Sequence, residues 1–262
     1  MHELPLLIFT LLVQGSVGLT LFIALATGEK RSLLPAMLVS CVMGGLGLIA
    51  STLHLGYPLN AFNALRHVES SWLSREIVFA SLYLAILGLA TLLVMLKKQP
   101  SRLLLALATL AGLVDIYCMG AIYVHSSVVT WQHINTWVMF FGAAGILGAA
   151  IGNGLLPGIK RLLRMAAVLV VAITAIRLLV QPDYVNFLAS ASLNEVVTLP
   201  HQPLVAFHQL TGLRNVAWGL SVLGSLLFAI GAWRSCRTAM LLGGLGLVVA
   251  EALLRFMFFS IL

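Results

Sequence analysis

The chain has 262 residues and a formal net charge of +7, but only 9% of its residues are charged while 61% are hydrophobic. Soluble globular domains carry about 25% charged residues, so this composition excludes a soluble domain and predicts an integral membrane protein whose solvent is lipid. The mean hydropathy of +1.06 agrees. Because the basic residues sit in scattered short loops, the positive charge indicates membrane topology and not a partner made of nucleic acid.

Eight near-continuous apolar runs follow one another along the sequence. Each is close to the roughly 20 residues needed to cross a hydrocarbon core. The runs do not alternate apolar and polar residues as β-barrel strands do, and backbone groups in lipid must be satisfied within the segment. The predicted helices cover residues 4–27, 35–55, 74–96, 103–124, 134–156, 162–180, 213–233 and 239–260. The sequence therefore predicts an all-α bundle of about eight transmembrane helices in a single domain over residues 1–262.

Lysine and arginine are divided unevenly between the two sets of alternating loops. One set holds Lys30, Arg31, Lys97, Lys98, Arg102, Lys160, Arg161, Arg164, Arg234 and Arg237, and the other, with its flanking helix ends, holds Arg66, Arg75, Arg177, Arg214 and Arg255. The positive-inside rule then predicts that both termini lie outside, in the periplasm for a bacterial protein. Two long loops are predicted on that outer side, at 56–73 and 181–212, and a partner is expected to dock there.

The cysteines and glycines indicate packing. Cys41, Cys118 and Cys236 are far apart and form no C-x-x-C motif, so they predict neither an iron–sulfur cluster nor a zinc site. Glycines recur at three- and four-residue spacing between Gly142 and Gly152. Small residues let helices approach closely, so this stretch is predicted to be a tight helix contact.

The candidates for ionisable groups within the lipid core are Asp115, Arg177, Glu251 and Arg255, which lie away from the ends of the predicted helices. Each costs about 2.5 to 3.5 kcal/mol at mid-bilayer on insertion scales, so each needs a reason to be there. Glu251 and Arg255 are four residues apart, where helical side chains meet. They are expected either to neutralise each other and lock the bundle, or to help form a polar pocket or proton route, and both readings stay open.

The densest polar patch runs from His54 and Tyr57 to Arg75 and Glu76. His54 lies at the predicted outer end of one helix and Glu76 near the start of the next, so both are expected near the outer membrane boundary. An imidazole can accept a hydroxyl proton at neutral pH, and a nearby carboxylate can orient it or pass the proton on. Quinol oxidation needs such groups. The alternative is a histidine that caps a helix and a glutamate favoured by the helix dipole.

Several motifs in this part of the sequence are typical of one family. They are His2-Glu3-x-Pro5-Leu6-x-Ile8-Phe9-Thr10, Ala50-Ser51-x-Leu53-His54-Leu55-Gly56-x-Pro58 and Leu73-Ser74-x-Glu76-Ile77, with Gln14, Gly18, Tyr123, Trp131, Arg214, Glu251 and Arg255 elsewhere. With them the sequence resembles the membrane-anchor subunit of the bacterial dimethyl sulfoxide reductase family. The resemblance spans nearly the whole sequence, and its specific motifs lie in the first three helices.

The resemblance implies an eight-helix anchor in the bacterial inner (cytoplasmic) membrane that oxidises menaquinol near the periplasmic face during anaerobic respiration. Electrons would pass to an iron–sulfur subunit of the four-cluster ferredoxin-like type and then to a molybdopterin subunit that reduces the terminal substrate. No haem, iron–sulfur cluster, molybdenum or other metal is expected in this protein. The family's quinol-site histidine falls on His54 and its important glutamate on Glu76, and Tyr57, Arg75, Glu251 and Arg255 are further candidates for the quinol pocket.

Two other classes of protein are weighed against this reading. A b-type cytochrome needs histidines paired on facing helices, whereas the seven histidines here fall at helix ends or in loops, and only a haem between His54 and His125 near the outer surface remains open. A transporter often has inverted repeats and helices broken at the midplane. This sequence has charges within helices but no matching pair of proline-interrupted helices.

Overall fold

The computed structural model describes residues 4–29, 32–53, 65–96, 99–156, 158–192 and 199–261. These residues include no strand, and eight of their helices are long and apolar enough to cross a membrane. They are α1 (Leu4–Leu25), α2 (Leu34–Leu53), α4 (Trp72–Met95), α5 (Arg102–Val124), α6 (Ile134–Leu155), α7 (Lys160–Ala191), α9 (Thr211–Arg234) and α10 (Arg237–Ser260). The predicted all-α membrane bundle is confirmed.

Three short helices lie between these spans: α8 (Pro203–Gln209) and the 3-10 helices η2 (Leu65–His67) and η3 (Val129–Trp131). The predicted loop 56–73 therefore contains a helical turn, and α4 begins at Trp72, slightly earlier than expected. Residues 56–64 of that loop lie outside the described residues.

Helix α7 is much longer than the predicted run 162–180. It covers 32 residues and contains Pro182, so the prediction of one long loop over 181–212 is wrong. The helix continues because Tyr184 and Leu188, beyond the proline, are buried against Phe207 of α8. Burial of those side chains outweighs the hydrogen bond that a proline removes from a helix interior.

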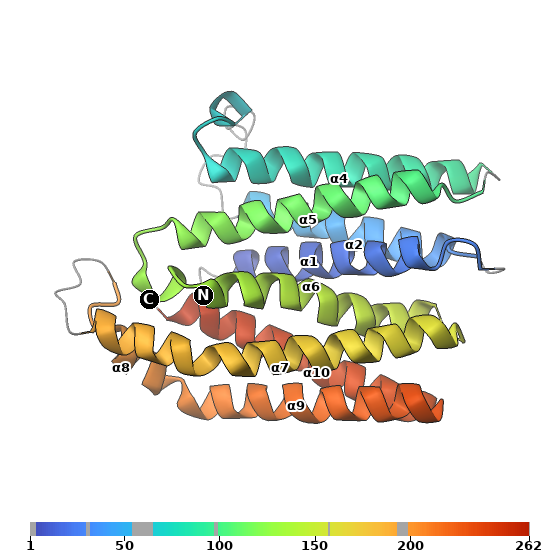
Figure 1. The fold of residues 1–262 in the computed structure, drawn as a ribbon. Coiled ribbons are helices and arrows are strands. Elements are labelled where there is room, and N and C mark those ends of the chain that lie inside the picture. The colour runs from blue at the N-terminus through green and yellow to red at the C-terminus, as the bar shows by residue number, and fades with distance from the viewer. Residues whose placement is uncertain are drawn as a thin grey trace.

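The spans pack as two four-helix units. In the first unit α1, α2, α4 and α5 each contact their neighbours around a ring, and α6, α7, α9 and α10 do the same in the second. Figure 1 shows the two units side by side, with α1 of the first unit and α6 of the second unit next to each other at the junction. Helix α1 also contacts α10 and is the most buried of the eight described spans.

The two units meet where the backbones of α1 and α6 touch. A Cβ atom on Gly18 would lie 1.9 Å from the carbonyl oxygen of Ala144, and one on Gly148 would lie 2.4 Å from the backbone of Gly18. No other residue type fits at either position without separating the helices. The tight contact predicted from the glycine spacing is confirmed here.

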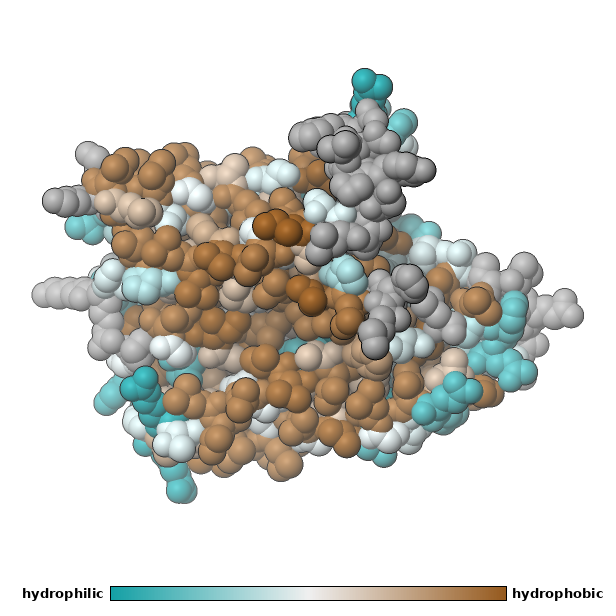
Figure 2. All heavy atoms as spheres, turned by 180° about the vertical axis from the view of Figure 1, so that it is seen from behind, coloured by the Kyte–Doolittle hydropathy of each residue, from teal (hydrophilic) through white to brown (hydrophobic). Residues whose placement is uncertain are grey.

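The bundle has two different ends. Helix α1 begins and α10 ends at the same end, where η2, η3 and α8 also lie (Figure 1); we call it the terminal end. The opposite, basic end carries Arg102, Lys160, Arg161, Arg164, Arg234 and Arg237 at the beginnings and ends of α5, α7, α9 and α10. Figure 2 shows a broad apolar belt between polar groups at the two ends, as expected for a membrane-spanning bundle.

A buried hydroxyl cluster fixes α4 against α1 and α2. The Tyr83 hydroxyl lies 2.6 Å from the Ser16 Oγ and 2.9 Å from the Thr20 Oγ1, and Ser40 of α2 bonds with both residues of α1. Interhelical hydrogen bonds in membranes average about 0.6 kcal/mol each, so their main effect is to set the rotation of α4. That rotation sets the direction of Ala80 and Glu76, which lie one and two turns before Tyr83 on α4.

Candidate functional site

Glu76 lies on the packed face of α4, close to the terminal end. The helix begins at Trp72, after Ser71, whose hydroxyl accepts a hydrogen bond from the Ser74 amide. The buried residues Glu76, Ala80, Tyr83 and Leu87 recur every three or four positions, which places them on one face. The Glu76 side chain therefore points into the first four-helix unit, and the residue is 5% exposed.

Asp115 of α5 shares this interior. It is fully buried, and among the described residues neither of its carboxylate oxygens has a hydrogen-bond partner. Its carboxyl interacts electrostatically with that of Glu76. Both ion pairs formed by the described residues involve other carboxylates. Within the part of the first unit that the structure describes, these two neighbouring carboxyl groups have no counter-ion, an arrangement that can take up and release a proton.

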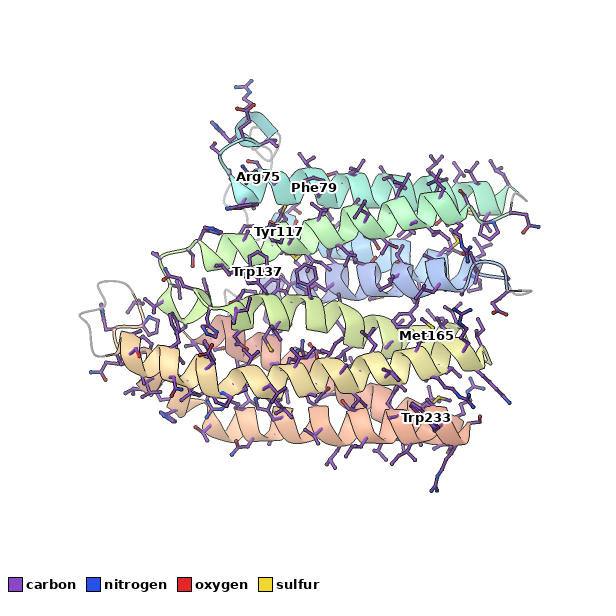
Figure 3. All side chains as sticks on the ribbon, in the orientation of Figure 1. Arg75, Phe79, Tyr117, Trp137, Met165 and Trp233 are labelled. Carbon is purple, nitrogen blue, oxygen red and sulfur yellow. The ribbon has the colours of Figure 1, made fainter. Side chains whose placement is uncertain are left out.

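Arg75 points away from this carboxyl pair. Its Nε donates to the Val68 carbonyl at 2.8 Å, its terminal NH2 donates to the Glu69 carbonyl at 2.6 Å, and its guanidinium lies 4.2 Å above the Trp72 ring. It thereby holds the turn that precedes α4. Figure 3 shows Arg75 near Tyr117 and Trp137 at the surface of α4, α5 and α6; Tyr117 and Trp137 are stacked, with ring centres 4.6 Å apart.

The second unit contains a buried ion pair. The guanidinium of Arg177 on α7 makes a two-pronged contact with the Glu251 carboxylate on α10 and donates to the Met139 carbonyl at 2.8 Å. Arg177 and Glu251 are at most 2% exposed. Gly142 makes room for the guanidinium, because a Cβ atom there would lie 2.6 Å from its Nε. Glu251 therefore forms its ion pair with Arg177, and not with Arg255 as the four-residue spacing suggested.

Arg255 instead connects the two units. Its guanidinium donates to the Gln14 side-chain oxygen of α1 at 2.6 Å and lies 3.9 Å from the Phe140 ring centre. The Gln14 amide in turn donates to the sulfur of Met119 at 3.7 Å. Met119 is one helical turn from Asp115 on α5. A line of side chains thus runs from Asp115 and Met119 in the first unit, through Gln14, to Arg255 beside the ion pair, with hydrogen bonds between Met119, Gln14 and Arg255.

This line lies in the half of the bundle near the terminal end. Glu76, Asp115, Glu251, Arg255 and Gln14 are each no more than ten residues from the end of their helix at that side. Ten residues of helix rise about 15 Å, which is half of a hydrocarbon core about 30 Å thick. Gln14 could not be assigned this role from sequence, because one amide in an apolar run gives no indication of its partner.

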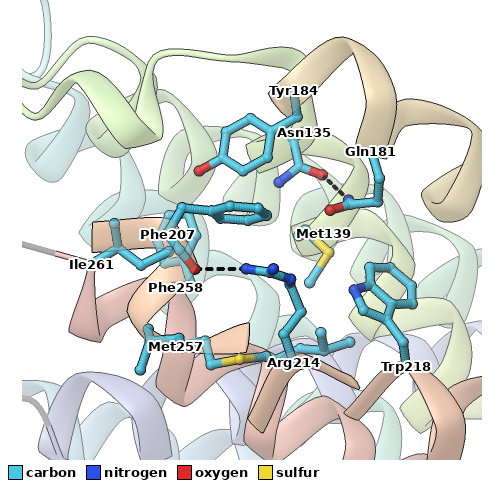
Figure 4. A pocket seen from close by; sticks show the side chains of 12 residues that line it. Asn135, Met139, Gln181, Tyr184, Phe207, Arg214, Trp218, Met257, Phe258 and Ile261 are labelled. Carbon is cyan, nitrogen blue, oxygen red and sulfur yellow. Dashed lines mark hydrogen bonds between the residues drawn. The ribbon is translucent and has the colours of Figure 1, made fainter. Parts of the chain in front are cut away.

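A small, mostly apolar cavity with a few polar side chains in its wall opens at the terminal end of the second unit, enclosed by α6 to α10 (Figure 4). Its volume is about 50 Å³, enough to hold water, which needs about 10 to 15 Å³ of such space. The Gln181 amide donates to the Asn135 side-chain oxygen at 3.1 Å and to the Arg177 carbonyl at 3.4 Å. Arg214 donates to the Phe207 carbonyl at 2.6 Å. The cavity therefore leads toward the buried ion pair, and the sequence did not reveal it because α8 was not predicted.

The candidates from the sequence fall into separate groups. His54 and Tyr57 lie outside the described residues. Glu76 and Arg75 lie in the first unit and Glu251 and Arg255 in the second, and the described residues show no direct contact between these two pairs. Among the described residues, the hydrogen bonds of Gln14 to Met119 and Arg255 connect the two units at this depth.

A helical bundle with eight apolar spans, and with its buried ionisable groups gathered in one half, defines a multi-span integral membrane protein. The chain belongs to the DMSO reductase anchor subunit (DmsC) family, whose model matches residues 1–261.

Three curated relatives are similar over part of the sequence. It is 37% identical over 166 residues to the C subunit of the anaerobic dimethyl sulfoxide reductase of Escherichia coli (strain K12), an alignment that covers 59% of this protein and 58% of the relative. It is 33% identical over 165 residues to the corresponding C subunit of Haemophilus influenzae, covering 60% and 59%. It is 32% identical over 164 residues to the anaerobic dimethyl sulfoxide reductase subunit YnfH of E. coli, covering 59% and 58%. The matched segments thus span less than two thirds of each relative. No solved structure gives a significant match.

Proposed function

We propose that this protein is the quinol-oxidising membrane anchor of a dimethyl sulfoxide reductase-type molybdoenzyme. It takes electrons from menaquinol near the terminal end and passes them to an iron–sulfur subunit, which supplies a molybdopterin subunit where the terminal substrate is reduced. Membership of the anchor family supports this proposal. The observation that carries it is the pair of buried carboxyls, Glu76 and Asp115, which form no ion pair with the described residues and lie in the half of the bundle near the terminal end.

The chemistry requires proton acceptors beside the quinol. Each quinol that becomes a quinone gives up two electrons and two protons, so a base must lie within hydrogen-bond reach of a hydroxyl. His54 follows directly on Leu53, the last described residue of α2, and α2 packs against α4. We assign the first proton to His54, and we assign its onward transfer to Glu76 with Asp115 behind it.

We further propose that the terminal end faces the periplasm of a bacterial inner membrane and that the iron–sulfur subunit docks there. The concentration of lysine and arginine at the opposite end supports this orientation through the positive-inside rule. The segments η2, η3 and α8 offer surface at the terminal end. Docking there keeps the electron path from the quinol to the iron–sulfur subunit short, because the buried ionisable side chains proposed to serve quinol oxidation lie in that half of the bundle.

Replacing His54 with glutamine tests the proposal. In the assembled complex, His54→Gln should abolish menaquinol-dependent reduction of the terminal substrate, because glutamine cannot accept the hydroxyl proton. Reduction driven by an artificial donor that feeds the catalytic subunit should persist, since that route bypasses the membrane anchor. The control is Arg237→Gln, which changes an exposed residue at the opposite, basic end of the bundle and should leave both activities intact.

Two variants of the carboxyl pair extend the test. Glu76→Gln should lose quinol-dependent turnover as His54→Gln does, and Asp115→Asn should slow it while retaining the side-chain volume. Wild-type quinol oxidation by His54→Gln, in complexes present at wild-type amounts, would refute the assignment of the proton acceptor. The amount of assembled complex is measured for every variant, so that loss of folding is distinguished from loss of chemistry.

A further inference from the structure

An elongated groove runs along α1 and α6 between α5 and α7. It consists of two cavities of about 420 and 490 Å³ that adjoin at Leu21 and Leu113, which line both. Figure 3 labels Trp137 and Met165, which line the part toward the terminal end and the part toward the basic end respectively. We call this feature the α1 groove.

The α1 groove opens toward lipid. Side chains at its edges are well exposed on the bundle surface: Leu110 is 59% exposed and Ile176 is 50% exposed. Gly145 keeps this part of the wall low, because a Cβ atom there would lie 2.4 Å from the Ile173 Cδ1 and 3.6 Å from the Leu169 Cδ2. Gly18 lets α1 pack directly against the backbone of α6 beside the groove.

The length of the α1 groove suits a lipid tail. Along α7 its lining extends from Arg161 to Ile176, and fifteen residues of helix rise roughly 22 Å. One leaflet of the hydrocarbon core is about 15 Å deep, so an acyl tail fits along the groove from the basic end. The lining of the deeper part is apolar throughout, with Val17, Leu169 and Ile173 among its residues.

Charged groups stand only at the basic mouth of the α1 groove. Arg102 and Arg161 lie there with Glu29, which leaves a formal charge of +1. Both arginines are exposed, and neither forms an ion pair with a carboxylate of the described residues. They stand at the first turns of α5 and α7, where the helix dipoles also favour an anion. Guanidinium groups bind phosphate with two parallel hydrogen bonds.

We propose that the α1 groove binds a glycerophospholipid. Its phosphodiester lies between Arg102 and Arg161, and one acyl tail runs along α1 toward Trp137. The bound lipid fills the space beside the Gly18 contact and thereby supports the joint between the two four-helix units.

Lipid retention tests this proposal without any measurement of activity. The complex is purified in a mild detergent with exhaustive exchange, and co-purifying phospholipid is counted by native mass spectrometry and by extraction. The wild type should retain one phospholipid per copy of the anchor. Arg102→Gln/Arg161→Gln should weaken retention by about tenfold or more, because a charge-assisted hydrogen bond contributes about 1.5 to 3 kcal/mol. The control Arg164→Gln/Arg234→Gln changes two exposed arginines at the same end that do not line the groove, and should retain the lipid.

A second pair of variants tests the groove with the mouth intact. Ile176→Trp fills the deeper part and should expel the lipid, whereas Val168→Trp, at an exposed position of α7 outside the lining, should not. The proposal is overturned if the wild type retains no phospholipid, if every variant retains the wild-type amount, or if the retained molecule is a quinone, whose isoprenoid tail would then be the occupant.

Discussion

Replacing Glu251 with glutamine removes the only carboxylate from a buried cluster that also holds two guanidinium groups. Arg177 and Arg255 are 1% and 3% exposed, and the Glu251 carboxylate interacts with both, so the cluster has a formal charge of +1. Glu251→Gln raises that charge to +2, and breaking a buried pair in this way costs about 3 to 5 kcal/mol. Arg177→Gln leaves Glu251 and Arg255 to balance each other, and should therefore cost less.

The formal charge of this cluster predicts that a second substitution restores part of the stability lost in Glu251→Gln. Adding Arg177→Gln to Glu251→Gln returns the cluster to +1, so the double variant should be more stable than Glu251→Gln alone. Thermal unfolding in detergent can be followed with a thiol-reactive dye, because Cys118 is 2% exposed in the folded protein; exposed Cys236 is first changed to serine to remove its signal. If Glu251→Gln were no less stable than Arg177→Gln, or if the second substitution gave no rescue, the charge count would be the wrong account of this cluster.

Two further predictions concern packing and orientation. Gly18→Ala should destabilise the protein by about 1 to 3 kcal/mol or more, because its Cβ atom would meet the backbone of α6. The control Gly45→Ala, whose Cβ atom would have nothing within 4 Å, should leave the unfolding temperature unchanged or raise it. Equal effects of the two substitutions would contradict the proposed contact between α1 and α6. A reporter that is active only in the cytoplasm should be silent when fused after the last residue of the sequence, and cross-links from the iron–sulfur subunit should fall on η3 and α8. An active reporter, or cross-links to Lys160 and Arg161, would reverse the proposed orientation.

The helices could be predicted because the bilayer fixes their length, so apolar runs near 20 residues identify them without knowledge of packing. This reasoning placed the C-terminal end of α7 too early, at residue 180 instead of Ala191. Pro182 and the polar residues beside it are typical of a helix end, and only the contact between Tyr184 and Phe207 of α8 shows why the helix continues. That contact depends on tertiary structure, which local patterns do not encode.

The candidate site was predictable in part. The cost of a charge in lipid identified Asp115, Arg177, Glu251 and Arg255 as residues that need partners, but not which partners. Glu251 pairs with a residue 74 positions away and Arg255 with one 241 positions away. Those pairings depend on how the helices pack, whereas the sequence shows only the neighbour one turn along the same helix. Whether His54 lies beside Glu76 stays a prediction.

The contact between Arg255 and Gln14 joins the last described span to the first, and this has a consequence for biogenesis. Helices enter the membrane in the order of synthesis, so α7 arrives with the Arg177 guanidinium before Glu251 has been translated. Until α10 inserts, that guanidinium lacks its carboxylate and Gln14 lacks its guanidinium. A nascent polypeptide halted before α10 therefore holds an unneutralised charge in lipid, which costs about 2.5 to 3.5 kcal/mol. Insertion of α10 supplies the carboxylate for Arg177 and the guanidinium for Gln14 in one step.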